Sequence, residues 1–545
     1  MEYLDDQVEL LRAGLDPESP VEHLAHRELQ VRVESLVYVW LADGRPELVP
    51  AAERALDQLV AQQGPDGLFL TGDNLVSPPD SAFTVNGLCR LLRVLAQRDE
   101  PELEAVRDTA TRVVVACRDA LVRGGVHTPN HRWEISCALV QLWHLFGWSD
   151  CLERAGEWLA EGVDLQEDGL FSERSPNYAV HVSGPCLLDM ARLLDRADLA
   201  DAVHRNLHAT VDLVDARDLV ETIQSRRQDQ RKDFPLSAYG LLYRRVAAAT
   251  GCGLCSAMAV RAEAGGGRGD VDAVAQALLD ARIGTLPPAE PTQAVAGWRV
   301  LTTSRLAVWQ RQSLRVVCHA PSDVARLGRV ASGTSADPTF AKVSLGDLTL
   351  GFRLSRSFFN LGPYRPTELA VDGATVTLIE RVESHYYQPL PPEAIRGDAD
   401  YDLEFEGRFA AQMAFSQRAR DTVSLETTVS VVPGERGVEM HLRTRGAGTG
   451  QLLELAVLGE SALGEVGGAV RLRDARTAVA EGDGTLLDGR MSVRLGGEVD
   501  AGALTSDYHP GEAYTFLGGT DAHAGPRLLV PFRSPSSLRL VLTLS

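Results

Sequence analysis

The fold is decided by the stretch Asp168-Gly-Leu-Phe-Ser-Glu-Arg-Ser-Pro-Asn-Tyr-Ala-Val-His-Val-Ser-Gly184. It begins as an Asp-Gly turn, continues as a polar loop, and reaches Pro176 directly before an apolar run with helical spacing. Proline is favoured in a first helical turn, because its φ angle suits the helix and it has no amide hydrogen to leave unpaired. The stretch therefore predicts a helix whose first turns carry Tyr178 and His181 on one face.

The same stretch also has a purely structural interpretation. Ser175 or Asn177 is a favoured N-cap residue, and Tyr178 would then be a wall residue of an amphipathic helix. The loop is, however, unusually polar for a lead into an apolar helix. Glu173, Arg174 and Asn177 are candidates for binding a polar substrate.

Helical spacing of apolar residues extends over residues 1–283, with short turns rich in Gly, Asp and Pro. The tetrapeptide Asp-Gly-Leu-Phe occurs at 66–69 and again at 168–171, each time before a polar loop and another helix. A loop that recurs in an array of helical hairpins predicts an incomplete α/α toroid. Loops at one end of such an array surround a central cleft, which suits an extended chain.

Beyond a Pro-rich linker at 284–297 the hydrophobic period becomes two. Residues 341–350 and 422–432 are examples, and Gly-containing turns separate such runs. Residues 298–545 are therefore predicted to form an antiparallel β-sandwich. The expected architecture is multidomain, a toroid followed by a sandwich.

The composition is that of an ordinary globular protein, with 44% apolar and 24% charged residues among 545. A net charge of −21 argues against a general nucleic-acid or anionic-membrane binder. The N-terminus has no apolar leader segment, so we expect a cytoplasmic protein unless a leader was removed. Cys252 and Cys255 are the one close cysteine pair, and no His flanks them, which disfavours a zinc or redox motif.

A second stretch, His127-Thr-Pro-Asn-His-Arg-Trp-Glu134, also lies at a predicted helix start. Its structural interpretation is an Asn130 cap with His131 and Arg132 on the surface. Its functional interpretation is a carboxylate site, because an amide and an imidazole both donate hydrogen bonds to a carboxylate. Trp133 is then a candidate to stack on a sugar face.

The third stretch, 221–233, contains the densest basic cluster of an acidic chain: Arg226, Arg227, Arg231 and Lys232. A charge run is most often a solvated loop. Guanidinium groups, however, bind carboxylates bidentately. Arg226 and Arg227 are therefore candidates to bind an anionic sugar, with an effect on KM rather than on turnover.

The segments 168–178, 129–133 and 225–227, placed before a β-sandwich, resemble the polysaccharide lyases that combine an α/α toroid with an antiparallel β domain. These are the heparinase II/III-like, alginate and hyaluronate or chondroitin lyases. The Asn-His-Arg-Trp sequence is most similar to the rhamnosyl-glucuronate lyases. The resemblance covers the toroid motifs well and the β domain in outline.

The resemblance implies a role for several residues. Tyr178 corresponds to the Brønsted acid/base, and Asn130 to the residue that neutralises the substrate carboxylate. A nearby His serves as base or neutraliser, and His131 and His181 both remain candidates. Some relatives hold a structural metal in the β domain. The histidines available for it here show no clear ligand spacing: His319, His385, His509 and His523.

These residue types suit β-elimination across a 4-linked uronate, which requires no cofactor. Hydrogen bonds to the carboxylate stabilise the dianion that forms when the α proton leaves, and an acid protonates the leaving oxygen. A uronate C5-epimerase shares the proton abstraction. A glycoside hydrolase would instead need two carboxylates, for which Asp66, Asp80 and Glu173 are candidates. A non-catalytic carbohydrate-binding scaffold would not need Tyr178.

Overall fold

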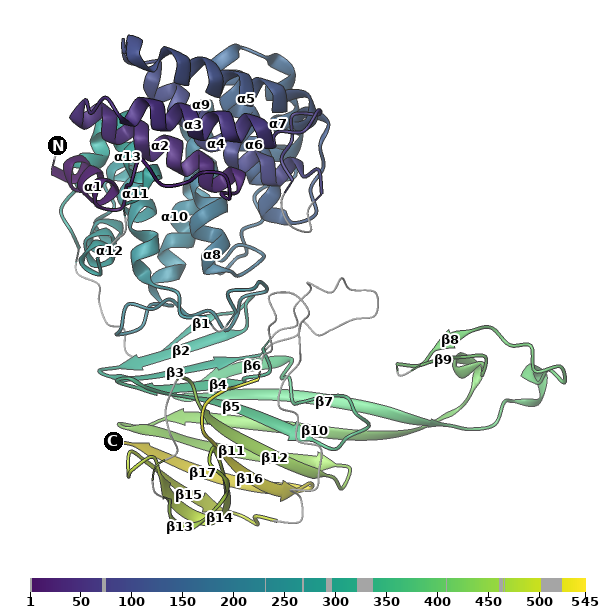
Figure 1. Cartoon of the computed structure of the whole chain (residues 1–545). Coiled ribbons are helices and arrows are strands. Elements are labelled where there is room, and N and C mark those ends of the chain that lie inside the picture. Colours follow the sequence, from purple (N-terminus) through teal and green to yellow (C-terminus); the bar gives the residue numbers. More distant parts are fainter. Residues whose placement is uncertain are drawn as a thin grey trace. The chain divides into compact units, whose positions relative to one another are not determined.

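The computed structural model describes residues 2–70, 75–230, 232–266, 269–290, 297–320, 337–407, 409–459, 464, 466–500 and 522–545. The chain divides into two compact units, Met1–Ala294 and Val295–Ser545. The first is helical and the second consists of strands (Figure 1). Among the helices that the structure describes, none has the length and apolar character needed to cross a membrane.

The first unit is a series of helical hairpins. Its helical elements are α1 (Glu2–Ala13), α2 (His26–Asp43), α3 (Leu48–Gln62), α4 (Pro78–Leu95), η1 (Pro101–Leu103), α5 (Glu104–Arg123), α6 (Pro129–Phe146), α7 (Ser149–Ala160), α8 (Pro176–Tyr178), η2 (Ala179–Ser183), α9 (Gly184–Leu194), α10 (Ala197–Val211), η3 (Leu236–Tyr239), α11 (Gly240–Thr250), α12 (Gly253–Ala264), α13 (Val271–Leu279) and η4 (Ala281–Gly284). Helix α2 packs on α3, α4 on α5, α6 on α7, α9 on α10 and α11 on α12. Helices α2, α4, α6 and α9 also pack on one another in that order and form the inner layer.

The inner helices begin at the same end of the array, because each hairpin reverses the chain twice. Helices α4, α6 and α8 begin alike, with a Ser or Thr followed by Pro. The Ser77 hydroxyl accepts the amide of Asp80 at 3.2 Å, and the Ser175 hydroxyl accepts that of Tyr178 at 3.1 Å. These caps satisfy amides that a helix start leaves unpaired. Several helix N-termini, each the positive end of its dipole, therefore gather at one end.

The repeated Asp-Gly-Leu-Phe turn has the same conformation in both copies. Gly67 and Gly169 have φ angles of +82° and +86°, a region that favours glycine. The Gly67 amide donates to Gly64 at 2.9 Å, and the Gly169 amide donates to Gln166 at 3.0 Å. A Cβ on Gly67 would lie 1.9 Å from the carbonyl oxygen of Ala116 on α5. The repeat predicted from the sequence is therefore present in the backbone.

The predicted helix that carries Tyr178 and His181 is present but not regular. The sequence predicted a regular helix that carries Tyr178 and His181 on one face. A single π turn, η2, lies between α8 and α9, and the Gly184 amide donates to Ala179, five residues back. The wider turn changes the helical phase. Tyr178 contacts Gln228, and the His181 ring lies 6.3 Å from that of Phe234; both partners belong to the loop before η3.

The second unit is antiparallel except where β14 pairs with β16. Its strands are β1 (Trp298–Leu301), β2 (Leu306–Arg311), β3 (Leu314–His319), β4 (Ala341–Leu345), β5 (Leu348–Arg356), β6 (Glu368–Asp372), β7 (Thr375–Tyr387), β8 (Glu404–Phe405), β9 (Ala410–Ala411), β10 (Arg420–Pro433), β11 (Gly437–Gly446), β12 (Gly450–Val457), β13 (Gly467–Asp474), β14 (Thr477–Leu486), β15 (Met491–Gly496), β16 (Arg527–Arg533) and β17 (Ser536–Leu544). The strands pair in the order β1-β2-β3-β4-β5-β12-β16-β14-β15-β17-β11-β10-β7-β6; β13 pairs with β14, and β8 pairs separately with β9.

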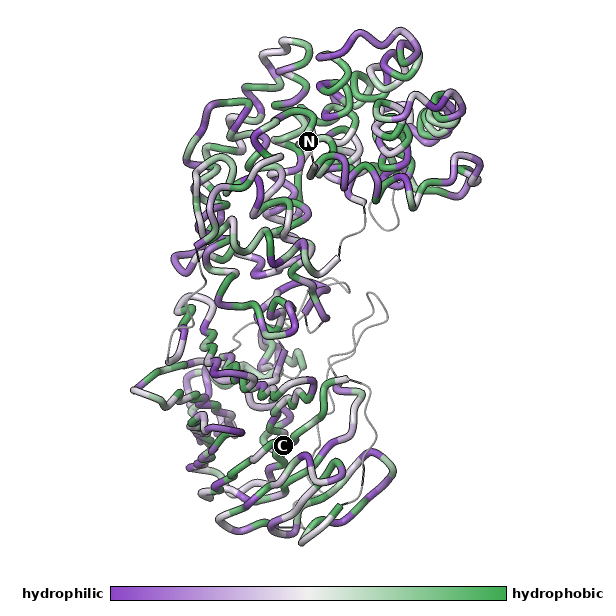
Figure 2. The backbone as a smooth tube through the Cα atoms, turned by 90° about the vertical axis from the view of Figure 1, so that its left-hand side faces the viewer, coloured by the Kyte–Doolittle hydropathy of each residue, from purple (hydrophilic) through white to green (hydrophobic). Residues whose placement is uncertain are grey.

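These strands form two layers around one apolar core, as predicted. Val343 and Phe352 from β4 and β5 share that core with Met440 of β11 and Leu540 of β17. Strand β14 joins the layers, since it pairs with β16 at its start and with β15 at its end. The alternating run 341–350 forms a hairpin, in which β4 and the start of β5 pair across a turn at Gly346. Hydrophobic and hydrophilic residues are interspersed along both units (Figure 2).

Candidate active site

Two loops that are far apart in sequence are bound together at the mouth of the inner helices: the loop before α8 and the loop before η3. The Asp229 carboxylate accepts the Ser175 hydroxyl at 2.8 Å and the Asn177 amide at 3.1 Å. The Arg226 amide donates to the Glu173 carbonyl oxygen at 3.0 Å. The segment that carries Tyr178 is therefore held by the segment that carries the basic cluster.

Tyr178 and Arg227 form the central contact between these loops. Arg227 Nη2 donates to the Tyr178 hydroxyl oxygen at 2.9 Å, and its guanidinium carbon lies 4.1 Å from the ring centroid. The hydroxyl also donates to Gln228 Oε1 at 3.2 Å. Arg227 Nη1 forms an ion pair with Glu173. The phenol is therefore fixed in position beside a guanidinium cation.

Glu173 lies beneath this pair and is 8% exposed. Burial raises the pKa of its carboxyl group, and the Arg227 charge opposes that rise. Glu173 therefore orients Arg227 rather than presenting a free carboxylate to a substrate.

Two further predicted substrate-binding residues support the loops instead. Arg226 Nη1 donates to the Ser172 carbonyl oxygen at 2.7 Å. Arg174 is buried, has a φ angle of +53°, and donates to Gln166 Oε1 at 3.3 Å. The half-buried Asn177 is held through its backbone amide, which leaves its side chain as a candidate contact.

Asn130 lies in the first turn of α6 and is 1% exposed. Its Oδ1 accepts the Thr128 hydroxyl at 2.7 Å, which fixes the amide orientation. Its Nδ2 is buried without a hydrogen-bond partner in the described part of the chain. An unpaired buried donor costs free energy, so a polar ligand that accepts from it would be favoured.

His131 follows it and is also buried. Burial lowers the pKa of its imidazole to about 4; His127, whose ring lies 4.7 Å away, and Arg227 lower it further, while Asp80 opposes them. His131 is therefore neutral at pH 7. The charge of Arg227, which contacts Tyr178, thus also acts on the His131 ring.

Arg132 and Trp133 do not face the mouth of the inner helices. Trp133 is completely buried, and its indole nitrogen donates to Asp164 at 3.1 Å. Arg132 donates to Glu161 at 2.7 Å. The expectation that Trp133 stacks on a sugar is therefore wrong, and both side chains connect α6 to neighbouring segments.

Sequence reasoning missed His26 and Arg27, which begin α2 as Asn130 and His131 begin α6. Arg27 pairs with Asp80 at the start of α4, and both charges act on His131. The pattern that could have identified His26 and Arg27 is a pair of polar residues in the first turn of an inner helix. Arg27 adds a cation to the mouth.

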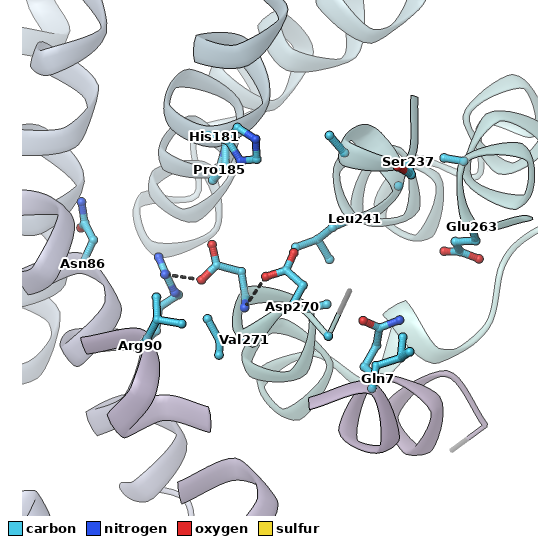
Figure 3. Close-up of a pocket in the computed structure, with 18 of the residues that line it drawn as sticks. Gln7, Asn86, Arg90, His181, Pro185, Ser237, Leu241, Glu263, Asp270 and Val271 are labelled. Carbon is cyan, nitrogen blue, oxygen red and sulfur yellow. Dashed lines mark hydrogen bonds and ion pairs between the residues drawn. The ribbon is translucent and has the colours of Figure 1, made fainter. Parts of the chain in front are cut away.

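A cavity of about 920 Å³ is lined by residues of α1, η3, α12 and α13 as well as of the inner helices (Figure 3). His181 projects into it from η2, and Arg27 also lines it, whereas Tyr178 does not. Arg90, paired with Asp272, and Asn86 lie on the opposite wall. Burial raises the pKa of Glu134, another lining residue, to about 7.

The carboxylates considered for a hydrolase each have a structural partner. Asp80 pairs with Arg27, and Glu173 pairs with Arg227. Asp66 accepts the Leu68 amide within its turn at 3.2 Å. This pairing does not resemble a free acid and base placed across a cleft.

The β-domain histidines do not form a metal site in the described residues of the second unit. His385 Nδ1 lies 3.0 Å from the Thr422 hydroxyl, and His523 Nε2 lies 3.1 Å from that of Thr339. His319 is buried, and His509 lies outside the described residues.

No family model and no curated protein match this sequence. Among solved structures, a heparinase III gene product matches with a TM-score of 0.53 at 9% identity, covering 95% of this chain and 77% of that one. The chain has the fold of that heparinase III. This likeness confirms the predicted class of α/α toroid followed by β-sandwich.

Two other solved structures align with nearly the whole chain. A heparan sulfate lyase from Pedobacter heparinus matches at 10% identity and a TM-score of 0.49, covering 99% of this chain and 88% of that one. A chondroitin AC lyase from Streptomyces coelicolor, in complex with chondroitin sulphate, matches at 14% identity and a TM-score of 0.47, covering 99% and 77%.

Proposed function

We propose that the protein is a polysaccharide or oligosaccharide lyase that cleaves a 4-linked uronate of the glucuronate type by β-elimination. The observation that carries the proposal is the Tyr178–Arg227 contact, a fixed phenol beside a cation at 2.9 Å. His131 lies within reach of the same charge, next to Asn130. The fold shared with the heparinase III supports this function.

The substrate carboxylate binds at the first turn of α6. Asn130 Nδ2 donates to it, and neutral His131 donates through a ring nitrogen. The N-terminus of α6 adds a positive dipole. These groups stabilise the second negative charge that develops when the proton next to the carboxylate is removed.

Tyr178 moves the proton. As a phenolate stabilised by Arg227, it takes the proton from C5 of the uronate. The electron pair left on C5 forms the C4–C5 double bond, and the C4–O4 bond breaks. Tyr178 then returns the proton to the leaving oxygen, so the step is balanced without an oxidant or a cofactor.

The local charge suits an anionic glycan although the whole chain carries −21. Arg227 and Arg27 stand at the mouth, and their carboxylate partners are more deeply buried than they are. Cations placed in this way attract a negative chain against the global field.

The test is a screen of uronate-containing glycans, polymers and short oligosaccharides, for new ultraviolet absorbance from a conjugated unsaturated uronate. The proposal expects absorbance with wild-type protein and its loss with Tyr178→Phe. An epimerised glycan of unchanged length, or a saturated reducing end, would replace the lyase with an epimerase or a hydrolase.

A further inference from the structure

In the helical unit, folding brings together four side chains of metal-ligating types that come from two separate segments of the sequence. His204 and His208 lie on α10, and Cys252 and Cys255 lie at the start of α12. Their ligand atoms all lie within 4.8 Å of one another. Helices α10 and α12 contact each other directly. No histidine flanks the Cys252–Cys255 pair in the sequence, but two histidines of α10 lie beside it in the folded protein.

Each pair is arranged by its own helix. His204 and His208 are four residues apart, so they share one face of α10, with ring centroids 4.5 Å apart. Cys252 is the N-cap of α12, and its sulfur accepts the Cys255 amide at 3.4 Å.

The side chains are close to ligand geometry. His208 Nε2 lies 3.3 Å from Cys252 Sγ. His204 Nε2 is buried without a hydrogen-bond partner in the described part of the chain. Zinc–nitrogen and zinc–sulfur bonds of about 2.0–2.3 Å give tetrahedral edges of about 3.3–3.8 Å. A small inward movement of the side chains would therefore complete a tetrahedron.

We propose that His204, His208, Cys252 and Cys255 bind one structural zinc ion. Two thiolates and two neutral imidazoles offset the charge of the divalent ion, and a mixed sulfur and nitrogen tetrahedron selects zinc. Four protein ligands close the coordination sphere, so the ion is structural and binds no substrate. The site lies in the helical unit, whereas the structural metal of some relatives named in the resemblance lies in the β domain.

The ion fastens α12 to a helix that supports the candidate active site. Asn206, between the two histidines on α10, donates to the Gly169 carbonyl oxygen at 3.0 Å. Gly169 belongs to the turn that leads toward Tyr178. Loss of the metal should therefore lower the free energy of unfolding directly. It should affect turnover only indirectly, by weakening the Asn206–Gly169 contact.

The test is the metal content of the full-length protein, measured by elemental mass spectrometry after reconstitution with zinc and washing with a weak chelator. We expect about one zinc per chain, and with cobalt a thiolate-to-metal charge-transfer band and tetrahedral d–d bands. Cys255→Ser and His204→Ala should each abolish or strongly weaken retention. Cys151→Ala and exposed His23→Ala are matched controls that should keep the metal.

Wild-type protein that retains no zinc and gives no tetrahedral cobalt spectrum would overturn the proposal, even if the ligand variants fail to fold. Retention of zinc by the folded Cys255→Ser and His204→Ala variants would also overturn it. A Cys252–Cys255 disulfide, found by thiol counting on protein purified without reductant and unaffected by zinc, would assign the pair to redox chemistry instead.

Discussion

Arg227 contacts Tyr178 in two ways: its Nη2 donates to the phenol oxygen at 2.9 Å, and its guanidinium carbon lies 4.1 Å from the ring centroid. The sequence suggested that Arg227 binds substrate and acts on KM. Under the proposed mechanism, a cation at this distance also stabilises the negative charge on the phenol oxygen, so we expect Arg227 to act on turnover as well.

We therefore expect Arg227→Lys to lower kcat as well as kcat/KM, since an ammonium group cannot both donate to the hydroxyl and stack on the ring. Arg226→Lys is the matched control, because Arg226 contacts the Ser172 carbonyl oxygen rather than Tyr178. Steady-state kinetics of both variants decide the point. A change confined to KM in Arg227→Lys would return Arg227 to a binding role.

Tyr178→Phe removes only the hydroxyl. Turnover should fall by roughly 10²–10⁴-fold, the usual contribution of a positioned acid or base. Tyr239→Phe is the control: it removes a nearby hydroxyl that donates to the Pro176 carbonyl oxygen at 3.3 Å. That variant should lose about 0.5–1.5 kcal/mol of stability and keep most of its turnover. Thermal melts must show that both proteins are folded.

Asn130→Ala should reduce turnover by about 10²–10³-fold if its amide donates to the developing dianion. Thr128→Val should cause a smaller loss, because it removes the 2.7 Å contact that orients the amide and keeps the amide itself. Near-wild-type turnover in a folded Asn130→Ala protein would remove Asn130 from the carboxylate site.

His131 and His181, the two candidates for the histidine of the mechanism, can be told apart by where they lie. His131→Ala should reduce turnover far more than His181→Ala, since His181 projects into the inner cavity. His131→Gln should recover part of the loss, because its amide still donates. Since burial lowers the pKa of His131 to about 4, its imidazole does not change charge above about pH 5, so the shape of the pH profile of kcat/KM above that pH should be the same in His131→Gln as in wild type. An equal loss in both Ala variants would contradict this assignment.

Glu34 gives a pH-dependent stability prediction. Burial raises the pKa of its carboxyl group from 4.5 to about 8, and Tyr38 donates to it at 2.9 Å. Between these values the folded protein holds a proton that the unfolded chain lacks, so this group's contribution to stability falls as pH rises. Its slope is at most about 1.4 kcal/mol per pH unit.

Glu34→Gln removes that slope. Its free energy of unfolding relative to wild type should increase from about pH 5 to about pH 8. Exposed Glu22→Gln controls for the loss of one negative charge. Denaturant unfolding at several pH values measures the difference, and a constant difference between Glu34→Gln and wild type would contradict the prediction.

Structural features that depend on a few neighbouring residues, such as turns, could be predicted from the sequence. The turns at Gly67 and Gly169 were predictable because identical residues demand the same positive φ angle. The burial of Trp133 was not predictable, since an indole beside polar residues suits either a sugar platform or a packed wall. Its contact with Asp164 depends on how α6 meets the following segment.

Contacts between segments that are far apart in the chain could not be predicted from the sequence either. The binding of Ser175 by Asp229 joins loops 54 residues apart in the chain. The approach of His208 to Cys252 depends on the packing of α10 on α12. Local periodicity carries no information about which helix faces meet, so spacing rules alone could not find either contact.

The most direct test of the central claim is the fate of solvent oxygen at the cleaved bond. A uronate glycan that wild-type protein cleaves should be digested in heavy-oxygen water and its products weighed by mass spectrometry. β-Elimination predicts an unsaturated uronate, lighter by one water than the hydrolysis product, with no heavy oxygen incorporated by cleavage. A saturated product that carries one heavy oxygen from solvent would contradict the lyase account.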